Sequence, residues 1–171
     1  MKLLATFRAS DVDPDAPIND YSTFKPRIAG RAIIYDGDKV ALLNVSKHGY
    51  YMLPGGGVEN EDVQTALRRE VVEEIGCKII TDQEVGSIET YFDRWERKQL
   101  DFCYTAHKEG NTFASTKTDF EKEEGHEILW VQNLDEAIRV VEGTNPKNLD
   151  GRLVRARDLL FLKSARKFVL N

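Results

Sequence analysis

The chain has 171 residues, with 24 lysines and arginines against 29 aspartates and glutamates, and a net charge of −5. Hydrophobic residues make up 41% and charged residues 31%, which excludes a disordered, collagen-like or membrane-spanning chain and predicts one compact unit. The acidic balance leaves no overall footprint for nucleic acid, so we expect neither a nucleic acid nor a membrane as a partner.

The first residues of the chain reach Thr6 and Arg8 before an apolar segment can form. We therefore expect no signal peptide and a cytoplasmic location. The two cysteines, Cys77 and Cys103, are too few for a disulfide framework, and a reducing compartment would keep them as thiols.

Strands and helices interleave along the predicted order of elements. Strands are predicted at residues 2–8, 28–35, 39–45, 50–53, 84–92, 100–107 and 128–131. Helices are predicted at residues 62–75, 135–142 and 152–169, the first of them ended by Gly76. We expect residues 1–27 to form an N-terminal strand and an acidic arm, and residues 28–171 to form a single domain. The order predicts an α/β (α+β) fold, a mixed β-sheet covered by helices.

The last predicted helix, residues 152–169, carries six basic side chains and one acid, Asp158. These charges are expected on an exposed face, opposite an apolar stripe that includes Leu153, Leu160 and Phe168. A basic face that attracts a polyanion is the alternative interpretation.

The helix at residues 62–75 gathers three carboxylates, those of Glu70, Glu73 and Glu74. At 100° per residue they share one face, which borders the apolar stripe instead of lying opposite it. Like charges three or four residues apart cost a helix about 0.2–0.5 kcal/mol per pair, so a bound cation would explain them. Carboxylate oxygens suit Mg²⁺ or Mn²⁺ better than zinc. A solvated acidic face is the alternative for these glutamates taken alone.

The residues around this helix have a regular spacing. Gly55 is followed after five residues by Glu61, and after seven more by Arg69-Glu70-Val71; Glu73-Glu74, Gly76 and Cys77 complete the segment 55–77. This segment resembles the Nudix box, and the chain resembles the MutT-like Nudix hydrolases. The resemblance implies a Nudix-type α/β/α sandwich. It also implies a pyrophosphohydrolase dependent on Mg²⁺ or Mn²⁺ that cleaves a diphosphate linkage in a nucleoside triphosphate or a related nucleoside-diphosphate-linked small molecule.

The resemblance also implies roles for individual residues. Arg69 would orient the carboxylates as a guanidinium fork, and Glu61 would act through water on the metal. The metal ligands would be Glu70, Glu73 and Glu74, a carbonyl of Gly55 or Gly56, and, outside the segment, Glu124, with Glu127 and Glu121 as alternatives. The general base is left open between Glu70, Glu73 and Glu124.

Three residues near the expected cleft, Tyr51, Arg94 and Trp95, are candidates for binding the rest of the substrate. Packing in the core or in a solvated turn is the alternative role for each. Secondary signatures of particular Nudix substrates are missing, so a small nucleotide is the expected partner. An ADP-ribose or nucleotide-sugar hydrolase and a catalytically silent nucleotide sensor are the alternatives. Family members are often dimers, so a homodimer is expected by analogy.

Overall fold

The computed structural model of the chain describes residues 1–116 and 118–169, with the backbone alone at residues 120, 121 and 169. The strands are β1 (Leu3–Phe7), β2 (Lys25–Asp36), β3 (Lys39–Val45), β4 (Tyr50–Met52), β5 (Lys78–Phe92), β6 (Arg97–Glu109) and β7 (His126–Val131). The helices are α1 (Ala9–Val12), α2 (Val63–Ile75), α3 (Asp119–Glu123), α4 (Leu134–Glu142) and α5 (Leu149–Val169), with 3-10 turns η1 (Tyr21–Thr23) and η2 (Asp93–Trp95).

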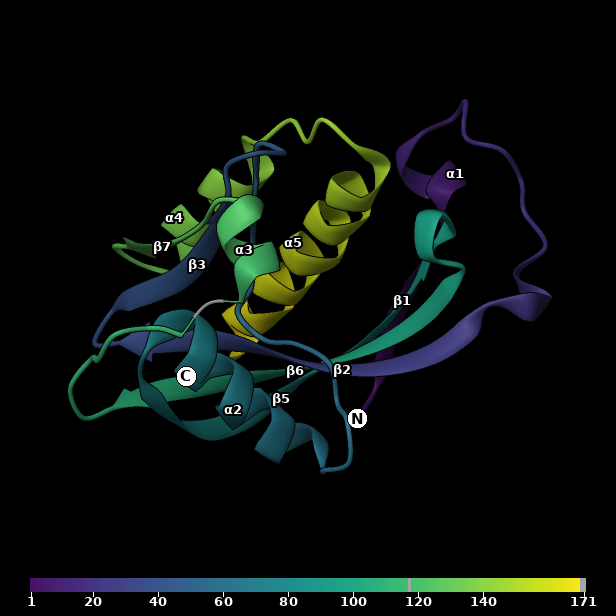
Figure 1. The fold of residues 1–171 in the computed structure, drawn as a ribbon. Helices are drawn as coiled ribbons and strands as arrows, with labels where there is room; N and C mark the ends of the chain where they lie inside the picture. The colour runs from purple at the N-terminus through teal and green to yellow at the C-terminus, as the bar shows by residue number, and fades with distance from the viewer. Residues whose placement is uncertain (117, 170–171) are drawn as a thin grey trace.

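The strands of the described residues form one seven-stranded sheet in the order β1-β5-β6-β2-β3-β4, and β7 pairs with β3. The pairs β1–β5 and β2–β6 are parallel, whereas the other pairs are antiparallel, so the sheet is mixed. Helix α2 covers one face of the sheet, and α4 and α5 cover the other (Figure 1). The fold is therefore an α/β/α sandwich, and the predicted fold class is confirmed.

Neighbouring residues of the central strands supply two separate cores. Ile33 packs in the cluster that contains Phe161 of α5, whereas Ile34 packs in the cluster that contains Leu67 of α2. All four side chains are fully buried. The alternation follows because successive side chains of a strand point to opposite faces of the sheet. The continuous apolar runs of β2 and β3 thus cover two interfaces at once.

Helix α2 has the bounds that the sequence predicts. The carboxylate of Asp62 caps its start by accepting hydrogen bonds from the amides of Gln64 and Thr65, both at 3.0 Å. At its end Gly76 has a φ of 71°, the left-handed conformation that favours glycine. The segment that carries the carboxylates is therefore a regular helix with both ends fixed by local sequence.

Some elements differ from their predicted bounds. Strand β5 begins at Lys78, six residues before the predicted start, and its register shifts between Thr81 and Gly86. The polar residues 82–84 lie at this irregularity, where they interrupt the alternation that reveals a strand. Two short helices were not predicted from the sequence. Helix α1 lies within the predicted acidic arm, and α3 lies just before β7.

The charges of α5 do not all lie on an exposed face. Arg157 is 1% exposed and Asp158 is fully buried, so for these two residues the expectation is wrong. They occur at the side of the helix that meets β4 and β6, where each has an ionic or hydrogen-bonding partner. Within the described residues, no helix combines the length and the apolar character needed to cross a membrane.

Candidate active site

The glycine run between β4 and α2 lies against the backbone of β2. The carbonyl of Gly56 accepts a hydrogen bond from the amide of Gly30 at 3.0 Å, and the amide of Val58 donates to Ile28 at 2.9 Å. Gly55 has a φ of 129°, and a Cβ at this position would lie 2.1 Å from the carbonyl oxygen of Gly30. Glycine is required at position 55 because of both its conformation and this close approach.

Arg69 of α2 holds together three of the carboxylates that the sequence singles out. Its Nη2 donates to Oε1 of Glu61 at 2.8 Å, and its Nη1 donates to Oε1 of Glu70 at 2.9 Å. The same Nη1 lies 3.6 Å from Oε2 of Glu73, and Nη2 also donates to the carbonyl of Gly57 at 3.2 Å. One planar guanidinium therefore orients the acids against the glycine run.

The carboxylates of Glu74 and Glu70 also contact the glycine run itself. Glu74 is 4% exposed, and its Oε2 accepts a hydrogen bond from the amide of Gly55 at 2.8 Å. The carboxylate of Glu70 lies beside Gly56, where a Cβ would come within 2.2 Å of the Glu70 Cδ. Burial raises the pKa of Glu70, although Arg69 opposes the change. Both glutamates thus lie directly against the glycine run.

The carbonyl of Gly55 accepts a hydrogen bond from Nη1 of Arg31. The carbonyl of Gly56, the alternative ligand, accepts from Gly30. A cation at the Gly55 carbonyl would therefore have to share it with a guanidinium of the same charge. In this structure Gly55 contributes to the site mainly through its amide, which holds Glu74.

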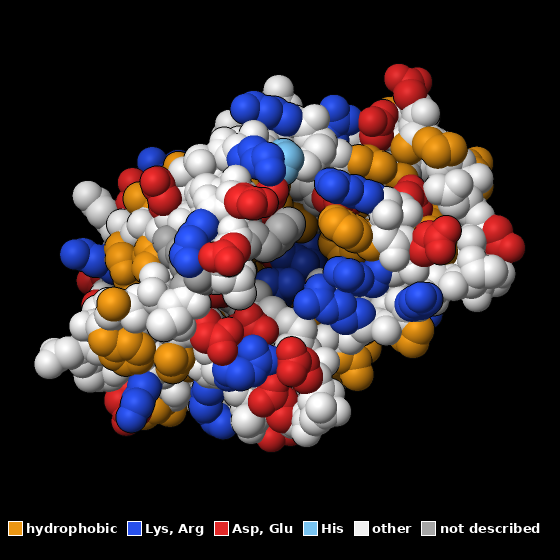
Figure 2. Space-filling model, in the orientation of Figure 1, with side chains coloured by type: hydrophobic (Ala, Val, Ile, Leu, Met, Phe, Trp, Pro, Cys, Tyr) orange, Lys and Arg blue, Asp and Glu red, His pale blue; other side chains and the backbone are white. Residues whose placement is uncertain are grey.

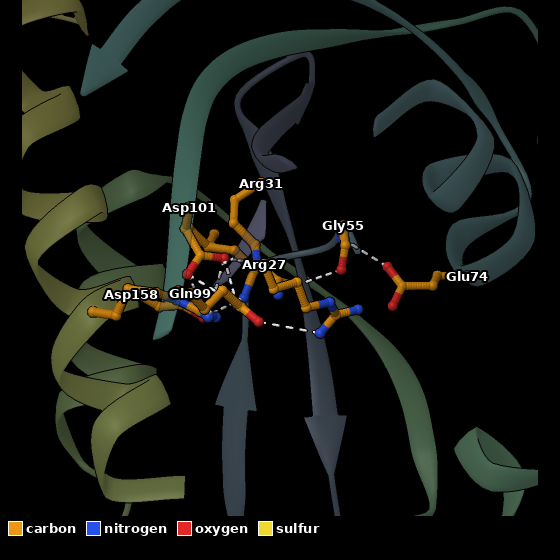
Figure 3. Close-up of polar contacts among 9 residues, drawn as sticks. Arg27, Arg31, Gly55, Glu74, Gln99, Asp101 and Asp158 are labelled. Carbon is orange, nitrogen blue, oxygen red and sulfur yellow. Dashed lines mark hydrogen bonds and ion pairs between the residues drawn. The ribbon is translucent and has the colours of Figure 1, made fainter. Parts of the chain in front are cut away.

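Behind the glycine run, a chain of buried charges connects β2 and β6 to α5 (Figure 3). Nε of Arg31 donates to Oδ1 of Asp101 at 2.9 Å, and Nη1 of Arg157 lies 3.3 Å from the same oxygen. Arg157 also donates to Asp158 at 2.7 Å, and Asp158 accepts from the amide of Leu53 at 2.8 Å. Each buried charge is compensated, as the interior of a protein requires.

A cleft of about 210 Å³ lies between this buried chain and solvent. Figure 2 shows it as a hollow in the middle of the face, with basic side chains inside it and acidic side chains on its rim. Its charged and polar lining comprises Arg27, Arg31, His48, Arg94, Arg97, Gln99, Glu124, His126, Asn148, Asp150 and Arg157. Its apolar and aromatic lining comprises Tyr50, Met52, Phe92, Trp95 and Val154.

Glu124, the acid expected outside the segment 55–77, lines this cleft. It forms an ion pair with Lys47 at 2.8 Å, and its Oε2 lies 2.7 Å from Nε2 of His48. Burial alone would raise the pKa of Glu124, but Lys47 and His48 together hold it below its usual value. Of its two alternatives, Glu127 is exposed, and the side chain of Glu121 lies outside the described residues.

The three expected substrate-binding residues lie in two different places. Arg94 and Trp95 line the cleft; the guanidinium of Arg94 lies 4.7 Å from the centre of the Trp95 ring, and the indole nitrogen donates to Asp150 at 3.1 Å. Tyr51 packs against the core cluster beneath α5 instead. Its neighbour Tyr50 lines the cleft, because adjacent residues of β4 face opposite sides.

Sequence reasoning missed the arginines and the acid behind the glycine run, namely Arg27, Arg31, Asp101 and Arg157. A signal was present for two of them: Arg31 and Asp101 each interrupt a predicted apolar strand. A charge in the middle of such a strand indicates a buried ion pair, because an unpaired charge is not tolerated there. The partners of these charges were not identifiable from the sequence, since Asp101 lies 70 residues from Arg31 and 56 residues from Arg157.

The donors of the segment 55–77 fit a divalent cation by their chemistry. They are carboxylate oxygens, which Mg²⁺ and Mn²⁺ prefer, and Gly56 leaves the Glu70 carboxylate space that a Cβ would fill. Over the residues that the structure describes, no three acids, histidines or cysteines already converge as a metal site. Arg69 and the Gly55 amide occupy the carboxylates here, so an ion would take the place of some of these contacts.

One comparison with known proteins identifies a family, and another identifies a shared fold. A family model described as the NUDIX domain matches residues 25–151, and no curated protein matches the chain. The solution structure of the E. coli ORF135 protein has a TM-score of 0.61 and 20% identity over 90% of this chain and 96% of that one. A MutT protein from Methanosarcina mazei has a TM-score of 0.58 and 21% identity over 85% and 96%. An ADP-ribose pyrophosphatase from Streptococcus suis has a TM-score of 0.52 and 20% identity over 83% and 93%. At these identities the solved structures show a shared fold.

Proposed function

The chain belongs to the NUDIX family of hydrolases, and from this premise we propose that it is a pyrophosphohydrolase dependent on Mg²⁺ or Mn²⁺. Its substrate is a nucleoside triphosphate or a related nucleoside-diphosphate-linked small molecule. The water oxygen bonds to one phosphorus of the diphosphate and loses its protons to base and solvent. The bond from that phosphorus to the bridging oxygen breaks, and the other phosphate leaves with the bridging oxygen and its electron pair. One observation carries the proposal: Arg69 gathers three carboxylates at the edge of a glycine run that adjoins an arginine-lined cleft.

Glu70, Glu73 and Glu74 are the residues proposed to hold the divalent ion. When bound, such an ion neutralises the charge of a diphosphate and lowers the pKa of water. Arg69 positions Glu70 and Glu61 through its guanidinium, and the amide of Gly55 positions Glu74. These contacts fix the carboxylates before the substrate arrives, which reduces the cost of ordering them during the reaction.

Glu124 is proposed as the acid from outside the helix. It lines the cleft, and its contacts with Lys47 and His48 lower its pKa, so it is ionised at neutral pH. An ionised carboxylate is able to act as a ligand or to accept a proton from water. The general base is therefore proposed to be Glu124, Glu70 or Glu73, and a separate substitution of each distinguishes them.

The cleft is proposed to bind the rest of the substrate through Arg94, Trp95 and Tyr50. Burial raises the pKa of Tyr50 to about 12, so its hydroxyl remains a hydrogen-bond donor at neutral pH. Tyr51 packs against the core cluster and does not line the cleft, so Tyr50 is proposed in place of Tyr51.

A nucleotide panel tests the proposal directly. Formation of the nucleoside monophosphate is measured by chromatography with nucleoside triphosphates, ADP-ribose and a UDP-sugar, each with and without Mg²⁺. Glu74→Gln and Glu73→Gln should each lower kcat by about 10²–10³-fold, the cost of losing one electrostatic contact to the reacting groups. Glu109→Gln, an exposed acid at the end of β6, is the matched control and should leave kcat unchanged.

The remaining outcomes of the panel are equally decisive. Nucleotide binding without turnover in the presence of Mg²⁺ would replace the proposal with a silent sensor. If the protein neither binds nor hydrolyses any of the nucleotides, the hydrolase and the silent sensor are both overturned. Turnover of ADP-ribose or a UDP-sugar in preference to triphosphates would establish the nucleoside-diphosphate-linked alternative.

By analogy with the family, we also propose that the protein is a cytoplasmic homodimer. Both cysteines are free and buried, as is usual in a reducing compartment. Sedimentation equilibrium tests the assembly, and a monomer mass at every concentration would contradict the dimer.

A further inference from the structure

The cleft beside the glycine run contains an excess of positive charge. Two of its five arginines, Arg31 and Arg157, belong to the buried chain of charges and are compensated by Asp101 and Asp158. The other three are Arg27, Arg94 and Arg97. Throughout the part of the chain that the structure describes, no carboxylate forms an ion pair with any of these three.

Arg27 lies at the end of the cleft nearest the proposed reaction. A Cβ on Gly57 would come within 2.5 Å of its Nη2, so its guanidinium is packed against the glycine run. Its hydrogen-bond partner is the neutral amide of Gln99, at 3.1 Å. Burial, Arg97 and Arg31 lower the pKa of Arg27, and Asp101 and Glu70 oppose the change. Among the described residues this half-buried guanidinium has no direct ion pair, so an anion in the cleft would stabilise it.

Arg94 and Arg97 lie further along the cleft, on η2 and at the start of β6. Both guanidiniums contact the ring of Trp95, at 4.7 Å and 5.8 Å from its centre. Arg94 and Trp95 are exposed and Arg97 is half-buried, so all three are accessible from the cleft. A planar base would have to displace these guanidiniums to stack on Trp95, whereas an anionic group would be attracted by both charges. Asp150, which also lines the cleft, offsets only part of this charge.

The size of the cleft also favours a small group. Pockets that enclose a whole drug-sized ligand have volumes of about 300–1,000 Å³, and this cleft has about 210 Å³. It therefore accommodates a part of the substrate. Arginine is the side chain best suited to grip a phosphate, because its planar fork donates two parallel hydrogen bonds.

We propose that the substrate carries a phosphate group beyond the two phosphoryl groups of the cleaved linkage, and that Arg94 and Arg97 bind this group while Arg27 contacts the linkage itself. The inference rests on the proposed function, since the position of the linkage is taken from the carboxylates of α2. The extra phosphate has two possible sources: a longer phosphate chain, or a phosphomonoester on the far sugar.

Binding measured without turnover tests the phosphate site by itself. In EDTA, isothermal titration compares ADP-ribose with ADP-ribose 2′-phosphate, and ADP with ATP, so each pair differs by one phosphate. The protein should bind the phosphorylated member of at least one pair about tenfold or more tightly, the usual worth of charge-assisted hydrogen bonds. The pair that responds identifies the source of the phosphate.

Variants then assign the preference to the two arginines. Arg94→Gln combined with Arg97→Gln should abolish the preference for the phosphorylated member of the pair. Arg94→Lys combined with Arg97→Lys keeps the charges and should retain a reduced preference. Arg139→Gln, an exposed arginine of α4, is the matched control and should have no effect.

The outcomes separate this inference from the proposed function. Equal affinity within both pairs, or a preference that survives in the double glutamine variant, overturns the phosphate site even if the enzyme hydrolyses nucleotides with Mg²⁺. A preference lost in that variant supports the phosphate site. Absence of hydrolysis of every substrate with Mg²⁺ overturns the proposed function and leaves this binding result standing.

Discussion

Substitution of Asp101 by asparagine is the sharpest test of the buried chain of charges. Asp101 is fully buried and accepts hydrogen bonds from Arg31 at 2.9 Å, from Gln99 at 2.9 Å and from Arg157 at 3.3 Å. Asparagine has nearly the same shape but no charge, and its amide group would face donors. Two buried guanidiniums would then share the single charge of Asp158.

The expected loss of unfolding free energy is about 3–5 kcal/mol, the usual cost of breaking a buried ion pair by removing one partner. Domains of this kind are stabilised by about 5–15 kcal/mol in total, so the variant should be folded but close to its limit. Urea denaturation measures the loss. Asp135→Asn is the control, because Asp135 pairs with Arg166 at 2.7 Å on the surface, where such pairs contribute about 0–1 kcal/mol.

The difference in unfolding free energy between the wild type and Asp101→Asn should also depend on pH, which gives a second measurement. Burial would raise the pKa of Asp101, but Arg157 and Arg31 outweigh it and hold the pKa below its usual value. A carboxylate with a depressed pKa stabilises the fold above its unfolded pKa of about 3.9. That contribution is lost as the pH falls through the folded pKa. The wild type and the variant should therefore differ by a constant amount near neutral pH and converge only in acid. A loss below about 1 kcal/mol at neutral pH, comparable to a surface pair, would refute the reasoning.

Two further predictions follow from the glycine run and the cysteines. Gly56→Ala places a methyl group 2.2 Å from the Cδ of Glu70, so kcat should fall about a hundredfold through displacement of that carboxylate. Gly143→Ala, at a φ of −75°, is the control. Equal steady-state rates for the wild type and Gly56→Ala would contradict the prediction. Burial raises the pKa of the Cys77 and Cys103 thiols, so Ellman's reagent should label neither in the folded protein and both after denaturation in guanidinium. Rapid labelling of the folded protein at neutral pH would show that the thiols are accessible.

The acidic half of the site was readable from the sequence because it lies within one helix and the turn before it. The rotation of 100° per residue places Glu70, Glu73 and Glu74 on neighbouring positions whatever the rest of the fold does. Asp62 and Gly76 set the ends of that helix through local hydrogen bonds. The interleaving of strands and helices along the chain likewise predicted a mixed sheet covered by helices, which is the fold observed.

Apart from Arg94, the basic half of the candidate site was assembled by the tertiary structure. In the sequence, Arg157 and Asp158 are indistinguishable from the exposed charges of an amphipathic helix, and Tyr50 is indistinguishable from Tyr51. Packing of α5 on the sheet buries the first pair, and the pairing of β4 turns Tyr50 toward the cleft.

The two halves differ because their interactions join residues at different separations along the sequence. Hydrogen bonds within a helix join residues four apart, so a short stretch of sequence specifies them. The burial of a charge depends on which distant segment supplies its partner, as with Arg31 and Asp101, which are 70 residues apart. The sequence by itself therefore established the carboxylates and the helix that presents them, and only the folded chain brought the arginines to the same cleft.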